Sequence, residues 1–209
     1  MRIAGSLWSV PVDARAHRLA TAVAAGLPVV HWDASDGRFA APGGFSPSTA
    51  GRLLASAPPV ESEAHLMSHA PAPEVPAWAE LCTTIVVPLE VDGAPAAVAA
   101  IEARGARPAL AVSLGTPLEQ VPSGLPVLLM AITPGEAGAP FDPAVLDRVR
   151  RLRDRGRNPL VGVDGGVGPG QFAALAEAGT QWLVSGTSLF QAPDPGAWLE
   201  ACRQSVPEG

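Results

Sequence analysis

Residues 159–179, PLVGVDGGVGPGQFAALAEAG, contain a complete strand, turn and helix. The apolar run PLVGVD has the composition of a parallel strand that is buried on both faces. The glycine-rich turn DGGVGPG ends this strand, and the apolar residues of QFAALAEAG then recur at helical spacing. The stretch therefore predicts a strand followed by a returning helix, which is the repeating unit of parallel α/β folds.

The same unit recurs on both sides of this stretch, so that eight units of about 26 residues fill the 209 residues. Predicted strands cover residues 3–7, 27–33, 60–67, 83–89, 108–114, 125–132, 159–164 and 181–186, and predicted helices cover 13–25, 46–57, 74–80, 95–104, 117–121, 142–156, 168–179 and 194–204. Eight such units close into a barrel more readily than they form an open sheet. An open dinucleotide-binding sheet would favour GxGxxG after the first strand, but Ser6 and Leu7 follow Gly5. We expect an α/β fold, a TIM (β/α)8 barrel, with residues 1–209 as one domain.

Composition limits the classes of function. The formal net charge is −6 and 47% of the residues are hydrophobic. This acidity argues against nucleic acid as a partner, and we interpret the arginine-rich residues 148–157 as a solvated helix face. No apolar run approaches the ~20 residues of a membrane span, and the N-terminal residues lack the pattern of a signal peptide. With Cys82 and Cys202 as the only cysteines, we expect a reducing, cytoplasmic setting and no membrane partner.

Two residue types are absent from the sequence. All 14 basic residues are arginine, and there is no lysine or tyrosine. A Schiff-base aldolase and a pyridoxal phosphate enzyme both need a lysine amine, so neither mechanism is available. A phenolic acid or base is excluded as well.

Polar residues stand at the carboxyl ends of several predicted strands, which is where a parallel barrel builds its site. They are Ser6, His31, Asp33, His65, Glu90 and Asp164. His31 and Asp33 share one face of their strand because they are two residues apart. A single histidine or aspartate at such a place is more often structural, but two of each favour a divalent metal, with zinc first and iron, manganese or cobalt as alternatives.

Other histidines and acids have simpler interpretations. Asp36 precedes Gly37 and predicts a turn. His69 lies four residues after His65, but prolines follow it at once, so we expect no helical metal pair and a surface position. His17 stands between arginines on the first predicted helix, and we expect it to face solvent.

Three glycine-rich loops, TPGEAGAPF (133–141), DGGVGPG (164–170) and SGTSLF (185–190), follow the last three strands. In barrels, the loops after strands seven and eight often hold a phosphate group on backbone N–H groups. Gly165, Gly166, Gly186 and Thr187 suit this role because glycine lets the backbone approach a ligand closely. Tight turns without a ligand are the alternative for any one of these residues.

Together these motifs resemble the ribulose-phosphate 3-epimerase family. The patterns H-x-D-x-x-D-G-x-F, H-L-M, M-x-x-x-P-G, V-D-G-G-V and G-[ST]-x-x-F occur in order, and the match extends from IAGSLWS (3–9) to SGTSLF (185–190). The resemblance implies a TIM barrel that uses one divalent metal ion to invert carbon 3 of a ketopentose phosphate. It also implies a homo-oligomer and a place in carbohydrate metabolism, in the pentose phosphate pathway.

The resemblance also implies roles for individual residues. The metal ligands are His31, Asp33, His65 and Asp164, and the acid-base pair is Asp33 and Asp164. The substrate-binding residues are Ser6, His65, Met67, Met130, Gly138, Gly165, Gly166, Gly186 and Thr187. Inversion needs one base on each face of a planar enediolate, and a metal ion can stabilise the enediolate charge by several kcal/mol.

Some positions depart from the family pattern. Ser35 and Pro88 replace a methionine and a histidine, AAP replaces VPN after Phe39, and GEAGA, with Glu136, replaces GFGGQ. The metal and acid-base set is complete, whereas the substrate shell is altered. The first expectation is therefore the conversion of D-ribulose 5-phosphate to D-xylulose 5-phosphate. A hexulose phosphate or another specialised sugar phosphate is an alternative, and so is a barrel that binds a sugar phosphate or a metal without turnover.

Overall fold

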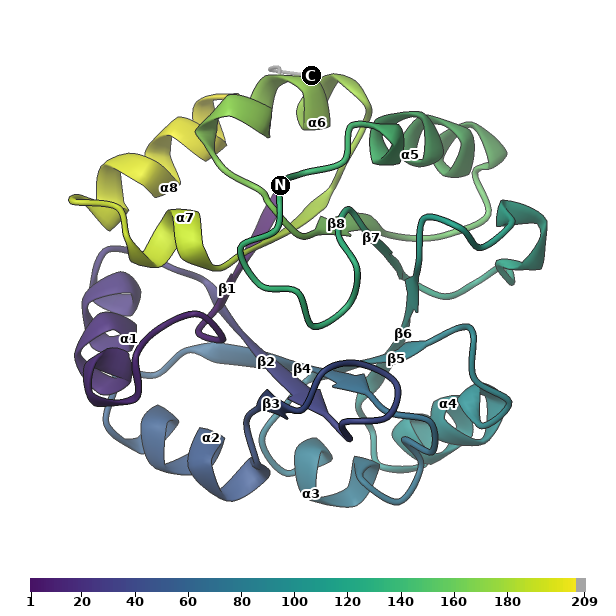
Figure 1. Ribbon diagram of the computed structural model, residues 1–209, viewed down its shortest axis with the longest axis horizontal. Coiled ribbons are helices and arrows are strands. Elements are labelled where there is room, and N and C mark those ends of the chain that lie inside the picture. The colour runs from purple at the N-terminus through teal and green to yellow at the C-terminus, as the bar shows by residue number, and fades with distance from the viewer. Residues whose placement is uncertain (206–209) are drawn as a thin grey trace.

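Eight parallel strands form a closed barrel (Figure 1) in the computed structural model, which describes residues 1–205. They are β1 (Arg2–Ser6), β2 (Val29–Ser35), β4 (Glu61–Met67), β5 (Thr84–Pro88), β6 (Arg107–Val112), β7 (Val127–Met130), β8 (Val161–Asp164) and β9 (Trp182–Ser185). They follow this order around the barrel, and β9 pairs with β1 to close it. The predicted TIM barrel is confirmed, and residues 206–209 of the expected domain lie outside the described residues.

Helices surround the barrel (Figure 1). They are α1 (Arg15–Ala24), α2 (Pro47–Ala55), α3 (Val75–Ala79), α4 (Ala94–Ala103), α5 (Ala144–Arg155), α6 (Phe172–Glu177), α7 (Thr187–Phe190) and α8 (Pro195–Gln204), with 3₁₀ turns at Val12–Ala14, Leu118–Gln120 and Pro169–Gln171. Ser46 caps α2 by accepting a hydrogen bond from the Thr49 N–H group at 3.2 Å. None of the helices within residues 1–205 has the length and apolar composition to cross a membrane.

Besides α7, a one-turn helix that was not predicted within the loop 185–190, two elements differ from the sequence-based expectation. The predicted helix at residues 117–121 is wrong, because only a 3₁₀ turn forms there. Pro122 explains this, since a residue before proline is driven out of the helical region, and Val121 is extended at φ −71° and ψ 116°. The second difference is an unpredicted short strand, β3 (Gly43–Gly44), which pairs antiparallel with the end of β2.

Successive side chains along each strand point alternately out of and into the barrel, and so form two separate apolar layers. Trp32 and Leu129 point outward and pack against the helices, whereas Val29, Leu128 and Trp182 fill the inside of the barrel. Because successive strand residues point to opposite faces, the inward positions that follow Val29 on β2 are those of His31 and Asp33. The polar residues of the site therefore enter the barrel by the same two-residue periodicity that builds its core.

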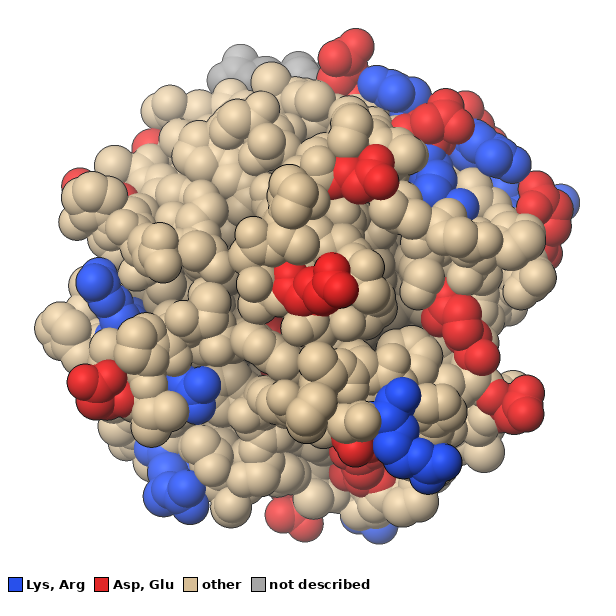
Figure 2. Space-filling view, viewed as in Figure 1, with Lys and Arg blue, Asp and Glu red and all other residues tan. Residues whose placement is uncertain are grey.

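Charged side chains lie on the surface in mixed groups. In Figure 2, the basic side chains over α5 are interleaved with acidic ones. Arg151 of α5 pairs with Glu119 at 3.1 Å, and Arg155 donates a hydrogen bond to the Leu118 carbonyl oxygen at 2.6 Å. The arginine-rich segment thus anchors the outer face of α5 to the 3₁₀ turn beside it.

Candidate active site

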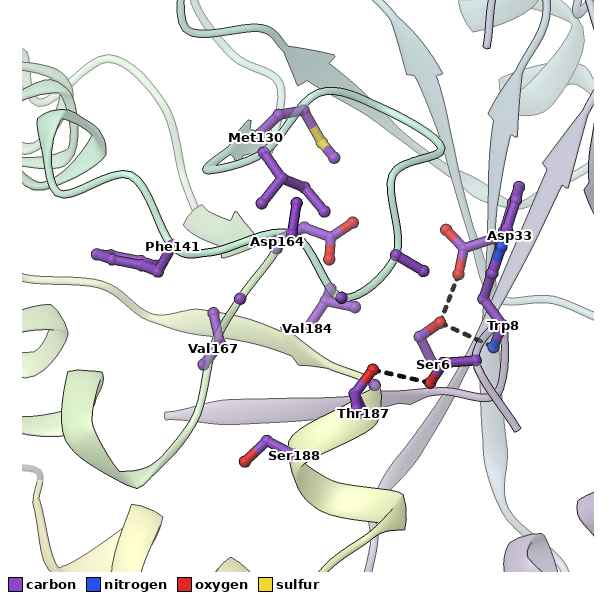
Figure 3. A pocket seen from close by; sticks show the side chains of 18 of the residues that line it. Ser6, Trp8, Asp33, Met130, Phe141, Asp164, Val167, Val184, Thr187 and Ser188 are labelled. Atoms are coloured by element: carbon purple, nitrogen blue, oxygen red, sulfur yellow. Dashed lines mark hydrogen bonds between the residues drawn. The ribbon is translucent and has the colours of Figure 1, made fainter. Parts of the chain in front are cut away.

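A cavity of about 310 Å³ opens at the carboxyl ends of the barrel strands (Figure 3). Residues that the sequence singled out form much of its lining, namely Ser6, Asp33, Met67, Met130, Gly138, Asp164, Gly165, Gly166, Gly186 and Thr187. The sequence did not single out Trp8, Ser9, Ile132, Phe141 and Ser188, which also line it. Trp8 and Ser9 could have been found, because they belong to the same strand end as Ser6.

Two histidines and two aspartates converge beneath this cavity: Asp33 and Asp164 line it, whereas His31 and His65, which was predicted to bind substrate, are fully buried behind them and do not line it. Each of His31, Asp33, His65 and Asp164 offers one potential ligand atom, and these atoms all lie within 4.8 Å of one another. The Asp33 Oδ1 atom is 3.4 Å from His31 Nε2 and 3.7 Å from His65 Nδ1, which in turn is 3.9 Å from Asp164 Oδ2. Register explains part of this arrangement, since Asp33 and His65 are direct partners on β2 and β4.

The nitrogen atoms of both histidines fit a metal ion. His31 Nε2 and both ring nitrogens of His65 are buried and have no hydrogen-bond partner among residues 1–205. A buried polar atom without a partner costs about 1–3 kcal/mol, and most such atoms in native proteins are satisfied. Of these nitrogens, His31 Nε2 and His65 Nδ1 face carboxylate oxygens at 3.4–3.9 Å, in the mixture that divalent transition metals prefer. The four residues therefore form a candidate metal site.

The electrostatics of the cluster separate the two carboxylates. Burial raises the pKa of Asp164 to about 6, with the charge of Asp33 adding to the effect and His31 opposing it. Burial would also raise the pKa of Asp33, but His31 and His65 outweigh it and hold this pKa well below the usual range. For His31, burial lowers the pKa, and Asp33 and Glu63 together raise it well above the ordinary value. Such a separation between two carboxylates is typical of an acid-base pair.

Ser6 is hydrogen bonded to one of these carboxylates (Figure 3). Its Oγ atom donates to Asp33 Oδ2 at 2.5 Å and accepts from the Trp8 N–H group at 3.3 Å. The hydroxyl thus holds Asp33 Oδ2, whereas the histidines face Oδ1.

Glycines let the loops after β7 and β8 pack closely beside the cavity. Gly165 and Gly166 have φ values of +109° and +63°. A Cβ atom would lie 2.5 Å from an Ile132 side-chain carbon at the first position and 2.5 Å from the Phe141 nitrogen at the second. Nearby, the Thr187 hydroxyl donates to Ser9 Oγ at 2.9 Å. No residue that lines the cavity within the described part of the chain is basic, so backbone N–H groups and hydroxyls are the donors at this end.

The remaining polar residues lie outside the cavity lining. Asp36 accepts hydrogen bonds from the Arg38 and Phe39 N–H groups at 2.8 Å, which confirms the predicted turn, and a third from the His69 N–H group at 2.8 Å. His69 and His17 are exposed, as expected. Glu90 is exposed too, and its side chain holds the loop after β6 through Ser113 and Thr116.

The sequence interpretation missed Glu63. This residue lies two positions before His65 on β4, is fully buried, and contacts His31 Nδ1 at 2.8 Å. The signal was available, because residues two apart on a strand share a face.

A model of the ribulose-phosphate 3 epimerase family matches residues 2–190. The chain belongs to the ribulose-phosphate 3-epimerase family. It is thus an isomerase that acts on a carbohydrate phosphate. A ribulose-phosphate 3-epimerase of Mycobacterium bovis is 34% identical over 201 residues, which cover 90% of this chain and 87% of that protein. The cytoplasmic isoform of Oryza sativa subsp. japonica is 31% identical over 201 residues, which cover 87% of this chain and 83% of that protein.

Solved structures of other sugar-phosphate enzymes share the fold. A 3-hexulose-6-phosphate synthase from Salmonella typhimurium has a TM-score of 0.72 at 15% identity, covering 99% of this chain and 98% of that one. Phosphoribosyl anthranilate isomerase from Thermus thermophilus has a TM-score of 0.70 at 19% identity, covering 98% of each chain. At these identities the likeness shows the fold alone.

Among the departures from the ribulose-phosphate 3-epimerase pattern, only the loop GEAGA (135–139) contributes residues to the cavity lining. Ser35 does not line it, and its hydroxyl donates instead to the Ala40 carbonyl oxygen at 3.0 Å. Pro88 is buried at the end of β5. Glu136 is exposed on the loop after β7, between the lining residues Gly135 and Ala137.

Proposed function

We propose that this protein is an epimerase that inverts carbon 3 of a phosphorylated ketose and interconverts D-ribulose 5-phosphate and D-xylulose 5-phosphate. The observation that carries the proposal is the pair Asp33 and Asp164, which line one cavity from strands that are separated by β1 and β9. Two carboxylates on different sides of a bound sugar are what an inversion requires, because the proton leaves one face and returns to the other.

In this proposal the two aspartates transfer protons. The carbon 3 proton is acidic because it is adjacent to the carbonyl group at carbon 2. Asp33 accepts this proton as a carboxylate, and the electron pair of the broken C–H bond forms an enediolate. Asp164, as the carboxylic acid, delivers its proton to the opposite face of carbon 3. The reverse reaction exchanges the two roles.

His31, Asp33, His65 and Asp164 would hold one divalent metal ion, with zinc as our first choice. Its positive charge would stabilise the negative charge of the enediolate by several kcal/mol. Ser6 keeps the Asp33 carboxylate oriented through its 2.5 Å hydrogen bond.

The other lining residues would hold the substrate. We assign Met67 and Met130 to the apolar wall beside the reacting carbons. The backbone at Gly138, Gly165, Gly166, Gly186 and Thr187 would bind the phosphate group. This assignment is supported by the absence of basic residues from the lining within residues 1–205, which leaves backbone N–H groups as the main donors for an anion.

A coupled assay with D-ribulose 5-phosphate, with and without a chelator, tests the proposal. We expect formation of D-xylulose 5-phosphate that the chelator abolishes and added metal restores. A panel of ketose phosphates tests which sugar is the substrate. This test is needed because the loop after β7, which carries the exposed Glu136, departs from the family pattern. If the protein clearly preferred a six-carbon substrate, the assigned substrate would be a hexulose phosphate and not a pentulose phosphate.

A further inference from the structure

A buried carboxylate lies beneath the candidate metal site, on the side away from the substrate cavity. Glu63 is 0% exposed and is the direct register partner of His31 across β2 and β4. Its Oε1 atom lies 2.8 Å from His31 Nδ1 and 3.1 Å from Trp182 Nε1, and its Oε2 atom lies 3.0 Å from an Arg2 NH2 group. Three groups from three other strands thus converge on one carboxylate.

The chemistry of these neighbours sets the direction of the contact with His31. The indole of Trp182 and the guanidinium of Arg2 can only donate hydrogen bonds, so Glu63 accepts from both. The Oε1 atom then accepts from His31 as well, which makes His31 Nδ1 the N–H donor. This leaves Nε2 as the free nitrogen of the ring. It points toward Asp33 Oδ1 at 3.4 Å and has no hydrogen-bond partner among residues 1–205.

The position of Glu63 excludes contact with the substrate. Glu63 does not line the cavity at the carboxyl ends of the strands. It lines a separate cavity of about 210 Å³ together with Arg2, Thr84, Arg107 and Trp182. Arg2 and Trp182 stand at the amino ends of β1 and β9, so this cavity belongs to the opposite end of the barrel.

We propose that Glu63 is a positioning residue, which holds the His31 ring with Nε2 directed at Asp33 and so strengthens metal binding. The inference rests on the metal site that is part of the proposed function. A carboxylate behind a ligating histidine fixes the tautomer and the orientation of its ring, and loss of such a carboxylate typically weakens metal binding about 10–100-fold. Arg2 and Trp182 hold the Glu63 carboxylate in turn.

The chain offers a matched control in Glu61. This residue lies on the same strand and accepts from the same Arg2 side chain at 3.1 Å, but it also pairs with Arg107 and its side chain is 34% exposed. If Glu63 acted only by pairing with Arg2, Glu61→Gln and Glu63→Gln would have similar effects. A positioning role through His31 predicts that they differ.

Zinc dissociation constants, measured by competition with a chromophoric chelator, test the proposal. Wild type and Glu61→Gln should bind zinc within about threefold of each other, whereas Glu63→Gln, checked for folding by circular dichroism, should bind ~10–100-fold more weakly. Equal zinc affinity in all three proteins would overturn the positioning role and leave the metal site intact. A wild-type protein that binds no zinc would overturn the metal site and this inference together.

A second measurement uses the wild-type protein alone and does not depend on how a variant folds. In zinc-loaded protein with ¹⁵N-labelled histidine, we expect the His31 ring to carry its proton on Nδ1, in a hydrogen bond protected from solvent. A ring protonated on Nε2, with zinc on Nδ1, would contradict the proposal.

Discussion

Asp33 contacts three other side chains of the site. One of its oxygen atoms faces His31 and His65, and the other accepts the Ser6 hydroxyl at 2.5 Å. These contacts lower its pKa, whereas Asp164 is left with a raised one. The two carboxylates are therefore not equivalent, and substitutions at each should have distinguishable consequences.

Asp33→Asn should lower epimerisation by ~10²–10⁴-fold, the usual range for the loss of a general base. The amide retains an oxygen, so metal binding should weaken and not disappear. Exchange of the carbon 3 proton with deuterated solvent should persist for the epimer that presents its proton to Asp164. Asp164→Asn should show the opposite preference. Proton NMR of both epimers in heavy water measures this, and equal loss of exchange from both epimers in each variant would contradict the two-base assignment.

Asp36, in contrast to Asp33, holds a turn outside the cavity lining. Desolvation raises its pKa, but the N–H groups of Phe39, His69 and Arg38 together outweigh it and lower the pKa below the usual range. A depressed folded-state pKa stabilises the fold above the ordinary aspartate pKa of about 4, and this contribution is lost as the pH falls below it.

Asp36→Asn should therefore cost about 1 kcal/mol of stability at pH 7 and leave turnover nearly unchanged. Asparagine keeps the bonds to Arg38 and Phe39 but places an N–H group against that of His69. Thermal unfolding of both proteins between pH 3 and pH 7 should show the difference shrinking toward acid. Loss of turnover in Asp36→Asn with normal turnover in Asp33→Asn would reverse the assigned roles.

The loops after β7 and β8 pack closely against each other because Gly166 has no side chain. Gly166→Ala should strain the backbone, because φ is +63° and the new methyl group would lie 2.5 Å from the Phe141 nitrogen. We expect a loss of about 1–3 kcal/mol in stability and a raised KM for the sugar phosphate. Gly170→Ala is the control, since a Cβ atom there would meet nothing within 4 Å. If the two variants had the same KM, the close packing of these loops would have no part in substrate binding.

Local sequence predicts most elements but not how far each one extends. Apolar runs and helical spacing located all eight barrel strands and the helices that follow most of them. The segment 117–121 failed because its apolar residues fit a helix while Pro122 prevents one. The strand β3 consists of two glycines, which carry no strand signal. In both segments backbone geometry, and not burial, decides the structure. The short helix α7 was also missed, because the segment 185–190 was interpreted as a glycine-rich loop.

The candidate site was predictable to the extent that it follows strand periodicity. His31, Asp33, His65 and Asp164 stand at strand ends, and closure of the barrel brings them within 4.8 Å of one another. The contacts of Glu63 depend on the register between β2 and β4 and on Trp182, which is 119 residues away in sequence. Contacts between strands that are distant in sequence cannot be predicted from a local sequence pattern.

A metal ion bound inside the barrel should stabilise the folded protein as a whole. Ligands that bind the native state raise its stability by mass action, by about 2.7 kcal/mol at a concentration 100 times the Kd. Added zinc should therefore raise the Tm of the wild-type protein. His65→Ala should lose this response and the catalytic activity, while His17→Ala, at an exposed position on α1, should keep both. An unchanged zinc response in His65→Ala would remove His65 from the ligand set.

We propose above that this barrel moves the proton on carbon 3 of a ketopentose phosphate from one face of that carbon to the other. The most direct test incubates the metal-loaded protein with D-ribulose 5-phosphate in heavy water and follows carbon 3 by proton NMR. We expect D-xylulose 5-phosphate to appear, deuterium to replace the carbon 3 proton, and a chelator to stop both changes. Retention of the carbon 3 proton with no xylulose 5-phosphate formed would contradict this proposal.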